Sequence, residues 1–225
     1  MTEVSKSQID RLGQRLVGTP TPDDLQFLAT YRQSFQGPLK EVADLVGKAS
    51  ADLPRSALSA RPAKSTVSII RKLQRESIRL SQMQDIAGCR LVVSTIDEQD
   101  AVVQALVREH PGWSVYDRRA RPSYGYRAVH VVATVGGKPI EIQVRTAPQH
   151  GWAEYSETLD RVAHGDVKYG GGPADVRESL DRLSDIVARL ERGEPPEGEL
   201  SLGELLASLG IMLIGIIAQR RRDDK

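Results

Sequence analysis

The chain of 225 residues has few of the features that mark a secreted or membrane protein, and it contains a single cysteine, Cys89. One cysteine excludes an intrachain disulfide and suits a reducing compartment, and the position of Cys89 inside an apolar run predicts a small core residue. The net charge is also small, at +1, because 31 Lys and Arg residues nearly balance 30 Asp and Glu residues. Such a balance gives no whole-molecule signal of nucleic-acid binding, so partners must be inferred from local sites.

Targeting segments and long hydrophobic runs are missing too. The first residues, 1–6, lack the apolar core of a secretory signal, which predicts a cytoplasmic protein. Residues 205–218 form an uncharged, largely apolar run that ends against Arg220, Arg221 and Arg222, but it is shorter than the roughly 20 residues a spanning helix needs. We expect this tail either to pack on the rest of the chain or on a partner, or to contact the inner face of the membrane peripherally.

The hydrophobic periodicity predicts a chain of helices and strands without internal repeats. Apolar residues at helical spacing predict helices over 7–16, 23–34, 38–48, 65–76, 97–109, 148–162 and 174–191. Runs rich in β-formers predict strands over 89–94, 113–117, 129–135 and 140–144, the last two joined as a hairpin through Gly136-Gly137-Lys138-Pro139. Residues 51–64 hold two prolines among small and basic residues and are expected to form a loop, after which Ser65 caps a helix.

Two carboxylates stand at the ends of predicted strands. Asp85 precedes the strand that begins at 89, and Glu141 begins the last strand of the hairpin. A sheet that brought these strands together would converge two carboxylates, the oxygen ligands that suit Mg²⁺ bridging to substrate phosphates. Taken alone, the residues also allow a structural interpretation, with Asp85 as a helix cap and Glu141 as an exposed strand residue.

Cationic residues surround the two carboxylates along the sequence: Arg61, Lys64, Arg71, Lys72, Arg79, Arg90, Arg118, Arg119, Arg121, Arg127 and Arg145. Carboxylates among many cations are what phosphoryl or pyrophosphoryl transfer requires, since the protein must position the transferring group and neutralise its charge. The pattern therefore points to chemistry on phosphates.

Tyr126 and His130 lie in a segment that runs from Gly125 into a strand. An aromatic ring after glycine is suited to stack on a nucleobase, and a strand histidine can hydrogen-bond a ribose or phosphate. Taken singly, such a tyrosine is more often a packing residue and such a histidine a satisfied strand residue.

Four segments follow one another along the chain: a basic Ser/Lys helix at 61–73, Asp85-Ile86-Ala87-Gly88-Cys89-Arg90, Gly125-Tyr126-Arg127-Ala128-Val129-His130, and Glu141-Ile142-Gln143-Val144-Arg145-Thr146 with Trp152-Ala153-Glu154 behind it. In this order they resemble the motifs of the RelA/SpoT-type alarmone synthetases. Each motif alone is weak, but four with compatible spacing are specific. The resemblance covers about residues 60–160. It implies a pyrophosphokinase, which transfers the β,γ-diphosphate of ATP to a ribose 3′-hydroxyl.

The resemblance also implies a fold and a set of site residues. The fold is α/β: a mixed, mostly antiparallel sheet of about five strands flanked by helices, as in nucleotidyltransferase-like synthetase domains, with helical extensions at both ends. By position, Asp85 and Glu141 would hold Mg²⁺, and Glu141 would activate the attacking hydroxyl. ATP would meet Arg61, Lys64, Ser68, Lys72 and Arg90. The acceptor would meet Tyr126, His130, Gln143 and Arg145.

The sequence departs from the family pattern at two places. Arg61-Pro62-Ala63-Lys64 is one residue longer than the usual Arg-x-Lys spacing, so Arg61 departs from the position of the family's arginine. Tyr124 occupies a position that varies in the family and that is expected to alter the acceptor pocket.

The expected organisation is a helical region at 1–50, a synthetase core at 51–165, a helix and linker at 166–198, and an apolar tail with a basic end at 199–225. The roughly sixty residues before the motifs carry no His-Asp pair of the hydrolase domain found in long members, so the chain resembles a small, single-function synthetase. Residues 79–90 and 168–172 resemble most the toxins of this group, which halt growth by making alarmones or by pyrophosphorylating the 3′ end of tRNA.

The partners and the acceptor are left open by the sequence. A growth-inhibiting toxin implies a neutralising antitoxin protein, for which an apolar helix is a suitable dock. The resemblance implies GDP or GTP, or the terminal adenosine of tRNA, as the acceptor. Arg118, Arg119 and Arg121 would serve either the phosphates of a mononucleotide or a tRNA backbone, so they leave the choice open. The alternative functions are a catalytically silent nucleotide-binding module of the same fold and a membrane-associated regulatory module defined by the tail.

Overall fold

The structure is a computed structural model that describes residues 4–61, 63–163 and 167–194. The apolar tail predicted to contact a partner or the membrane lies outside these residues. The described residues form two compact units, the first drawn from residues 4–91, 101–115 and 130–144 and the second from 92–100, 116–129 and 145–194.

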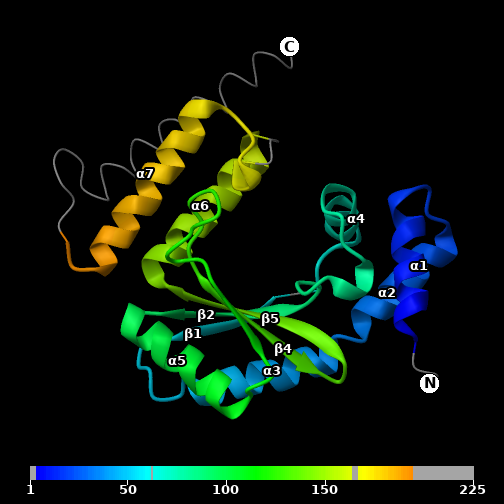
Figure 1. The fold of residues 1–225 in the computed structure, drawn as a ribbon, viewed down its shortest axis with the longest axis horizontal. Helices are drawn as coiled ribbons and strands as arrows, with labels where there is room; N and C mark the ends of the chain where they lie inside the picture. The colour runs from blue at the N-terminus through cyan, green and yellow to red at the C-terminus, as the bar shows by residue number, and fades with distance from the viewer. Residues whose placement is uncertain (1–3, 62, 164–166, 195–225) are drawn as a thin grey trace. The chain divides into compact units, whose positions relative to one another are not determined.

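The N-terminal part of the first unit is helical, as predicted. Its helices are α1 (Lys6–Val17), α2 (Pro22–Gln33), α3 (Gln36–Ala49) and α4 (Thr66–Arg75), followed by a 3₁₀ turn, η1 (Leu80–Gln82). α1 contacts α2, α4 and η1, and α3 packs on strand β1 (Figure 1). Ser5 and Thr21 cap α1 and α2 through reciprocal hydrogen bonds with Gln8 and Asp24, and Ser65 caps α4, so three helix starts are fixed by local sequence.

The five strands form one mixed, mostly antiparallel sheet, which confirms the predicted α/β fold class. They are β1 (Ala57–Arg61), β2 (Gly88–Val93), β3 (Ser114–Asp117), β4 (Val129–Val135) and β5 (Lys138–Thr146), and their order across the sheet is β1-β2-β5-β4-β3. β4 and β5 form the predicted hairpin, which turns at Gly136 and Gly137 with φ of 54° and 69°. These positive angles favour glycine. Helix α5 (Ile96–Glu109) follows β2 along the chain.

Strand β5 alternates apolar and polar residues, and from Ile142 to Thr146 both of its faces are buried. Ile140, Ile142 and Val144 are fully buried, and Glu141 and Gln143 alternate with them. Because successive strand side chains point to opposite faces, the apolar residues fix the register that brings Glu141 and Gln143 to the same side. Cys89, on β2, is also fully buried, and burial raises the pKa of its thiol to about 12. The prediction of a small core residue is confirmed.

Strand β1 corrects one expectation, because residues 51–64 were expected to form a loop and Ala57–Arg61 is a strand. All five of its residues are exposed, so the sequence carries no apolar alternation there. β1 is an edge strand beside β2, and backbone pairing rather than side-chain burial defines it.

The second unit has its own apolar core. Helices α6 (Ala147–Ala163) and α7 (Ala174–Glu191) lie side by side, with the 3₁₀ turn η2 (Val167–Tyr169) against α6 (Figure 1). The core gathers Trp152, Leu159, Leu180, Leu183 and Val187, and the indole Nε1 of Trp152 donates to the carbonyl of Leu180 at 2.9 Å. Among the helices of the described ranges, none combines the length and the apolarity needed to cross a membrane.

Candidate active site

A polar cavity of about 100 Å³ opens in the first unit, where β2 and β5 begin. Its lining is Arg61, Lys64, Asp85, Ile86, Ala87, Gly88, Cys89, Glu141 and Gln143. Five residues of the predicted site therefore line one cavity. Arg61 comes from β1, Glu141 and Gln143 come from β5, and Lys64 and Asp85 come from the segments that precede α4 and β2.

Backbone contacts of residues 85–88 build this wall. The amide of Glu141 donates to the carbonyl of Ala87 at 3.1 Å, and the amide of Lys64 donates to the carbonyl of Ile86 at 2.7 Å. A Cβ at position 88 would overlap the carbonyl oxygen of Glu141, so only glycine allows the two strands to approach this closely. Gly88 is not among the predicted site residues. The signal for it was a glycine at the start of an apolar strand, which often marks close backbone approach.

Asp85 is held between two ammonium groups. Lys64 Nζ lies 2.7 Å from Asp85 Oδ2, and Lys72 Nζ lies 3.0 Å from Asp85 Oδ1. Burial alone raises the pKa of Asp85, but the charges and hydrogen bonds of the two lysines outweigh it, so the pKa lies below its ordinary 3.8. Asp85 is therefore ionised at neutral pH.

Glu141 is fixed by two polar neighbours. His130 Nδ1 donates to Glu141 Oε1 at 2.9 Å, and Gln143 Nε2 donates to Glu141 Oε2 at 2.6 Å. Arg61 Nη1 donates in turn to Gln143 Oε1 at 3.4 Å. Burial raises the pKa of Glu141, but the hydrogen bond and charge of His130, the hydrogen bond of Gln143 and the charge of Lys72 lower it to about 2.

The remaining predicted ATP residues lie on α4 and β2. Ser68 is exposed in the first turn of α4, where its hydroxyl accepts a hydrogen bond from Ser65 at 2.9 Å. Arg90 is half-buried on β2. Their contact with a nucleotide stays a prediction.

The residues of the cavity fit a magnesium ion that is bound partly by the protein and partly by substrate phosphates. Two ionised carboxylates, Asp85 and Glu141, line one cavity, and oxygen is the ligand Mg²⁺ prefers. In the parts of the chain that the structure describes, no cluster of three or more His, Cys, Asp or Glu side chains could hold a metal. A site with two carboxylates leaves the other positions to water and substrate phosphates, which is usual for Mg²⁺.

The predicted acceptor residues divide between the two units. His130 and Gln143 lie with Glu141 in the first unit, whereas Tyr126 and Arg145 belong to the second. There the guanidinium of Arg145 donates to the Tyr126 hydroxyl at 2.8 Å from Nη2 and 3.2 Å from Nε, and lies 5.0 Å from the ring centroid. Arg145 thus fixes the orientation of the ring that is predicted to stack on a base.

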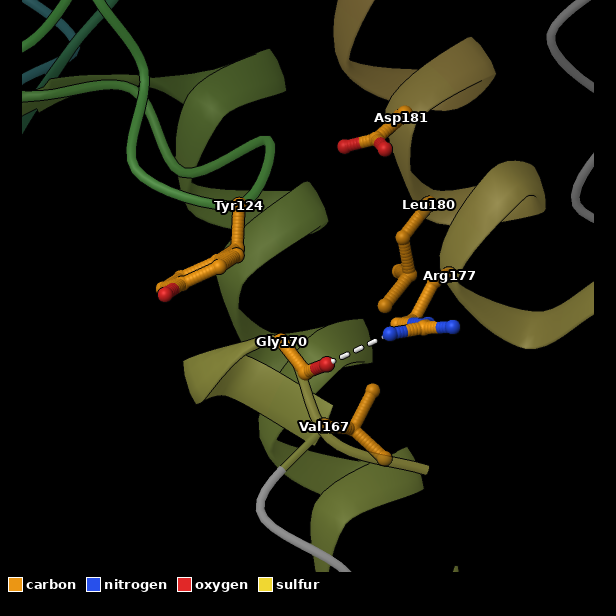
Figure 2. A pocket seen from close by; sticks show the side chains of 6 residues that line it. All are labelled: Tyr124, Val167, Gly170, Arg177, Leu180 and Asp181. Carbon is orange, nitrogen blue, oxygen red and sulfur yellow. Dashed lines mark hydrogen bonds between the residues drawn. The ribbon is translucent and has the colours of Figure 1, made fainter. Parts of the chain in front are cut away.

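A second cavity, of about 230 Å³, lies in the second unit (Figure 2). Its lining is Tyr124, Val167, Gly170, Arg177, Leu180 and Asp181, and Arg177 donates to the carbonyl of Gly170 at 2.9 Å. Tyr124 has a φ of 52°, and a Cβ on Gly170 would overlap its ring. The helical pattern of 174–191 presents Arg177 and Asp181 only as part of a charged face, and nothing in the spacing indicates a cavity there.

Comparison with known proteins gives consistent matches. Residues 61–160 match the family model described as the region found in RelA/SpoT proteins. The GTP pyrophosphokinase YjbM of Bacillus subtilis is 31% identical over 205 residues, which cover 79% of this chain and 93% of that protein. The small alarmone synthetase 1 of Bacillus subtilis bound to its product pppGpp superposes with a TM-score of 0.59 at 25% identity, over 77% of this chain and 95% of that one. A second structure of the same synthetase gives a TM-score of 0.56 at 26% identity, over 77% and 94% of the two chains.

Proposed function

The chain belongs to the RelA/SpoT family as a small synthetase, a diphosphotransferase by class, and we propose that it transfers the β,γ-diphosphate of ATP to the 3′-hydroxyl of a guanine nucleotide. One observation carries the proposal: the cavity of the first unit presents two ionised carboxylates, Asp85 and Glu141, together with cationic side chains. Such a site neutralises and positions phosphates, which is the main task of a phosphoryl-transfer enzyme. The relatives named GTP pyrophosphokinase and the synthetase bound to pppGpp support guanine in the acceptor.

The donor side of the proposed site consists of cations. Arg61, Lys64 and Lys72, with Ser68 and Arg90, would contact the triphosphate of ATP, and Asp85 and Glu141 would hold Mg²⁺. When bound, Mg²⁺ would neutralise charge on the transferring phosphates. The contribution of the chain itself is to hold these groups in place, through the 85–88 backbone and the capped start of α4.

Glu141 would act on the attacking hydroxyl chiefly through orientation. A carboxylate with a pKa of about 2 holds a proton only transiently at neutral pH, so it is a weak base. His130 and Gln143 leave it little freedom, since each holds one of its oxygens. We propose that the fixed carboxylate aligns the 3′-hydroxyl. Stacking of Tyr126 on the base stays a prediction from the family resemblance.

The acceptor is identified by incubating the purified protein with γ-labelled ATP and, in turn, GDP, GTP and deacylated tRNA. We expect label in a guanosine product with both guanine nucleotides, and none with a 3′-deoxyguanosine nucleotide, which lacks the attacked oxygen. Label in tRNA, with none in the guanosine product, would show that the acceptor is the tRNA 3′ end and not a guanine nucleotide. No transfer to any acceptor, from a folded protein that binds ATP, would favour a silent nucleotide-binding module.

A growth-inhibiting role belongs to the same proposal. Of the three arginines that would serve a tRNA backbone, Arg118 and Arg121 are exposed, whereas Arg119 pairs with Asp117 at 2.6 Å and Asp100 at 2.7 Å. Expression of the chain should halt growth, and Asp85→Asn should restore it. A neutralising antitoxin and a contact of the 199–225 tail with the membrane surface stay predictions.

A further inference from the structure

Both oxygens of Asp85, the carboxylate assigned to the metal, already face positive charge. The distances of 2.7 Å to Lys64 and 3.0 Å to Lys72 leave each oxygen with an ammonium partner. The three side chains are only 19–25% exposed, so water screens these charges weakly. A divalent cation approaching Asp85 would meet two ammonium groups at the positions where its own bonds would form.

The two lysines are anchored by their backbones and can swing at their ends. The Lys64 amide is fixed to the Ile86 carbonyl at 2.7 Å, and Lys72 lies in α4. An ammonium on a four-carbon stem is a mobile point charge, unlike the rigid fork of arginine, and it binds phosphate oxygens readily. A triphosphate in the cavity would offer both lysines several anionic oxygens in exchange for one carboxylate.

We propose that Lys64 and Lys72 close Asp85 to metal in the nucleotide-free enzyme, and that the ATP triphosphate draws both lysines away so that metal and nucleotide bind together. This inference rests on the proposed function, because it takes ATP as the donor. It adds that each lysine exchanges Asp85 for the phosphates when ATP binds. Lys72 Nζ also lies 3.8 Å from Oε2 of Glu76, at the C-terminal end of the same helix. By linkage, the factor by which ATP favours the metal must equal the factor by which the metal favours ATP.

The test uses Mn²⁺ alone as a probe, followed by electron paramagnetic resonance of the full-length protein without nucleotide. The unaltered protein should bind Mn²⁺ weakly, and Lys72→Met should tighten binding about tenfold, within the range of coupling between sites. Arg71→Met is the matched control, because Arg71 is exposed on the same helix and its removal changes net charge equally. It should change Mn²⁺ affinity less than twofold. In the double variant Asp85→Asn/Lys72→Met the increase in Mn²⁺ affinity should disappear, which would locate the metal at Asp85.

Equal Mn²⁺ affinities for Lys72→Met and Arg71→Met would overturn the proposal. Lys64→Met provides an independent variant should Lys72→Met fail to fold by circular dichroism. In the unaltered protein, equal Mn²⁺ affinity with and without α,β-methylene-ATP, after correction for metal chelated by the free analogue, would also overturn it. None of these measurements needs turnover. A protein that is inactive but binds Mn²⁺ more tightly after Lys72→Met would therefore contradict the proposed function, and not the proposal that the two lysines block Asp85.

Discussion

At the scale of single residues, the two site carboxylates are kept ionised by different neighbours. Asp85 owes its lowered pKa to two lysine ammonium groups, whereas Glu141 owes its lowered pKa mainly to His130 and Gln143. The two sets of neighbours differ in kind, because lysine ammonium groups stand on flexible stems, while His130 and Gln143 are strand residues that are 8% and 5% exposed. The neighbours of Asp85 can thus change position, whereas those of Glu141 are held in the sheet.

Removing either charge should abolish transfer. Asp85→Asn and Glu141→Gln keep the side-chain shape but take away negative charge at the place proposed for the metal, so we expect a loss of at least about 10²-fold in turnover. Transfer of labelled diphosphate from ATP is the measurement, and far-ultraviolet circular dichroism is the control for folding. Near-normal turnover in either variant would contradict its proposed role.

Gly88 should be intolerant of a side chain. Gly88→Ala places a Cβ against the Glu141 carbonyl, which is backbone and cannot yield easily, so we expect a loss of about 1–3 kcal/mol in the free energy of unfolding. Gly112→Ala is the control, because a Cβ there meets nothing within 4 Å, and it should change stability by less than about 0.5 kcal/mol. Urea denaturation of both variants measures the difference. Equal midpoints would mean that the two strands can move apart at no cost.

At the scale of elements, α7 holds the loop that carries Tyr126 through hydrogen bonds with Arg127. Arg127, next to Tyr126, donates from Nε to Ser184 Oγ at 2.9 Å and from Nη2 to Asp185 at 3.0 Å, and its Nη1 donates to the carbonyl of Arg119. Its side chain is only 13% exposed, whereas that of Asp185 is 75% exposed. The buried contacts of Arg127 should therefore contribute most of the stabilisation, and the exposed ion pair little.

Substitutions of Arg127 and of Asp185 should lower the free energy of unfolding by different amounts. Arg127→Met leaves the Ser184 hydroxyl and the Arg119 carbonyl without this donor and should lower the free energy of unfolding by about 1–3 kcal/mol. Asp185→Asn removes one exposed charge and should cost less than about 1 kcal/mol. Chemical denaturation of both variants is the measurement. A larger loss for Asp185→Asn than for Arg127→Met would show that the ion pair, and not the buried contacts, holds the loop.

The elements differ in how far the sequence alone predicts them. Helix caps and apolar periodicity are local, so α4 with its Ser65 cap and the β4–β5 hairpin follow from short stretches of sequence. β1 does not, because its exposed residues gain their strand structure from a neighbour distant in the chain. The candidate site divides in the same way. The motifs identify Asp85 and Lys72, but the pairing of Lys72 with Asp85 depends on where α4 lies relative to the turn that precedes β2.

At the scale of the whole molecule, we predict that the 199–225 tail is dispensable for catalysis. The catalytic motifs end before residue 160, and an uncharged run followed by Arg220, Arg221 and Arg222 is suited to an anionic surface or a partner. A chain cut after Gly198 should keep transfer activity and lose any capture by anionic vesicles. Replacement of the three arginines by serine should lower capture without the deletion. Loss of activity on truncation would place the tail in the catalytic unit.

Acid should destabilise the protein partly through Glu141. Its pKa is lower in the folded chain, about 2, than the ordinary 4.5, so its ionised form stabilises the fold. This contribution is fully present above about pH 4.5 and is lost as the pH falls through 4.5 towards 2. At 1.36 kcal/mol for each pKa unit it amounts to roughly 3 kcal/mol at most. Glu141→Gln lacks the titration, so the difference in unfolding free energy between the unaltered chain and this variant should shift by that amount between pH 5 and pH 2. Urea denaturation at several pH values measures it. A difference that stays constant over this range would show that His130 and Gln143 do not hold Glu141 ionised.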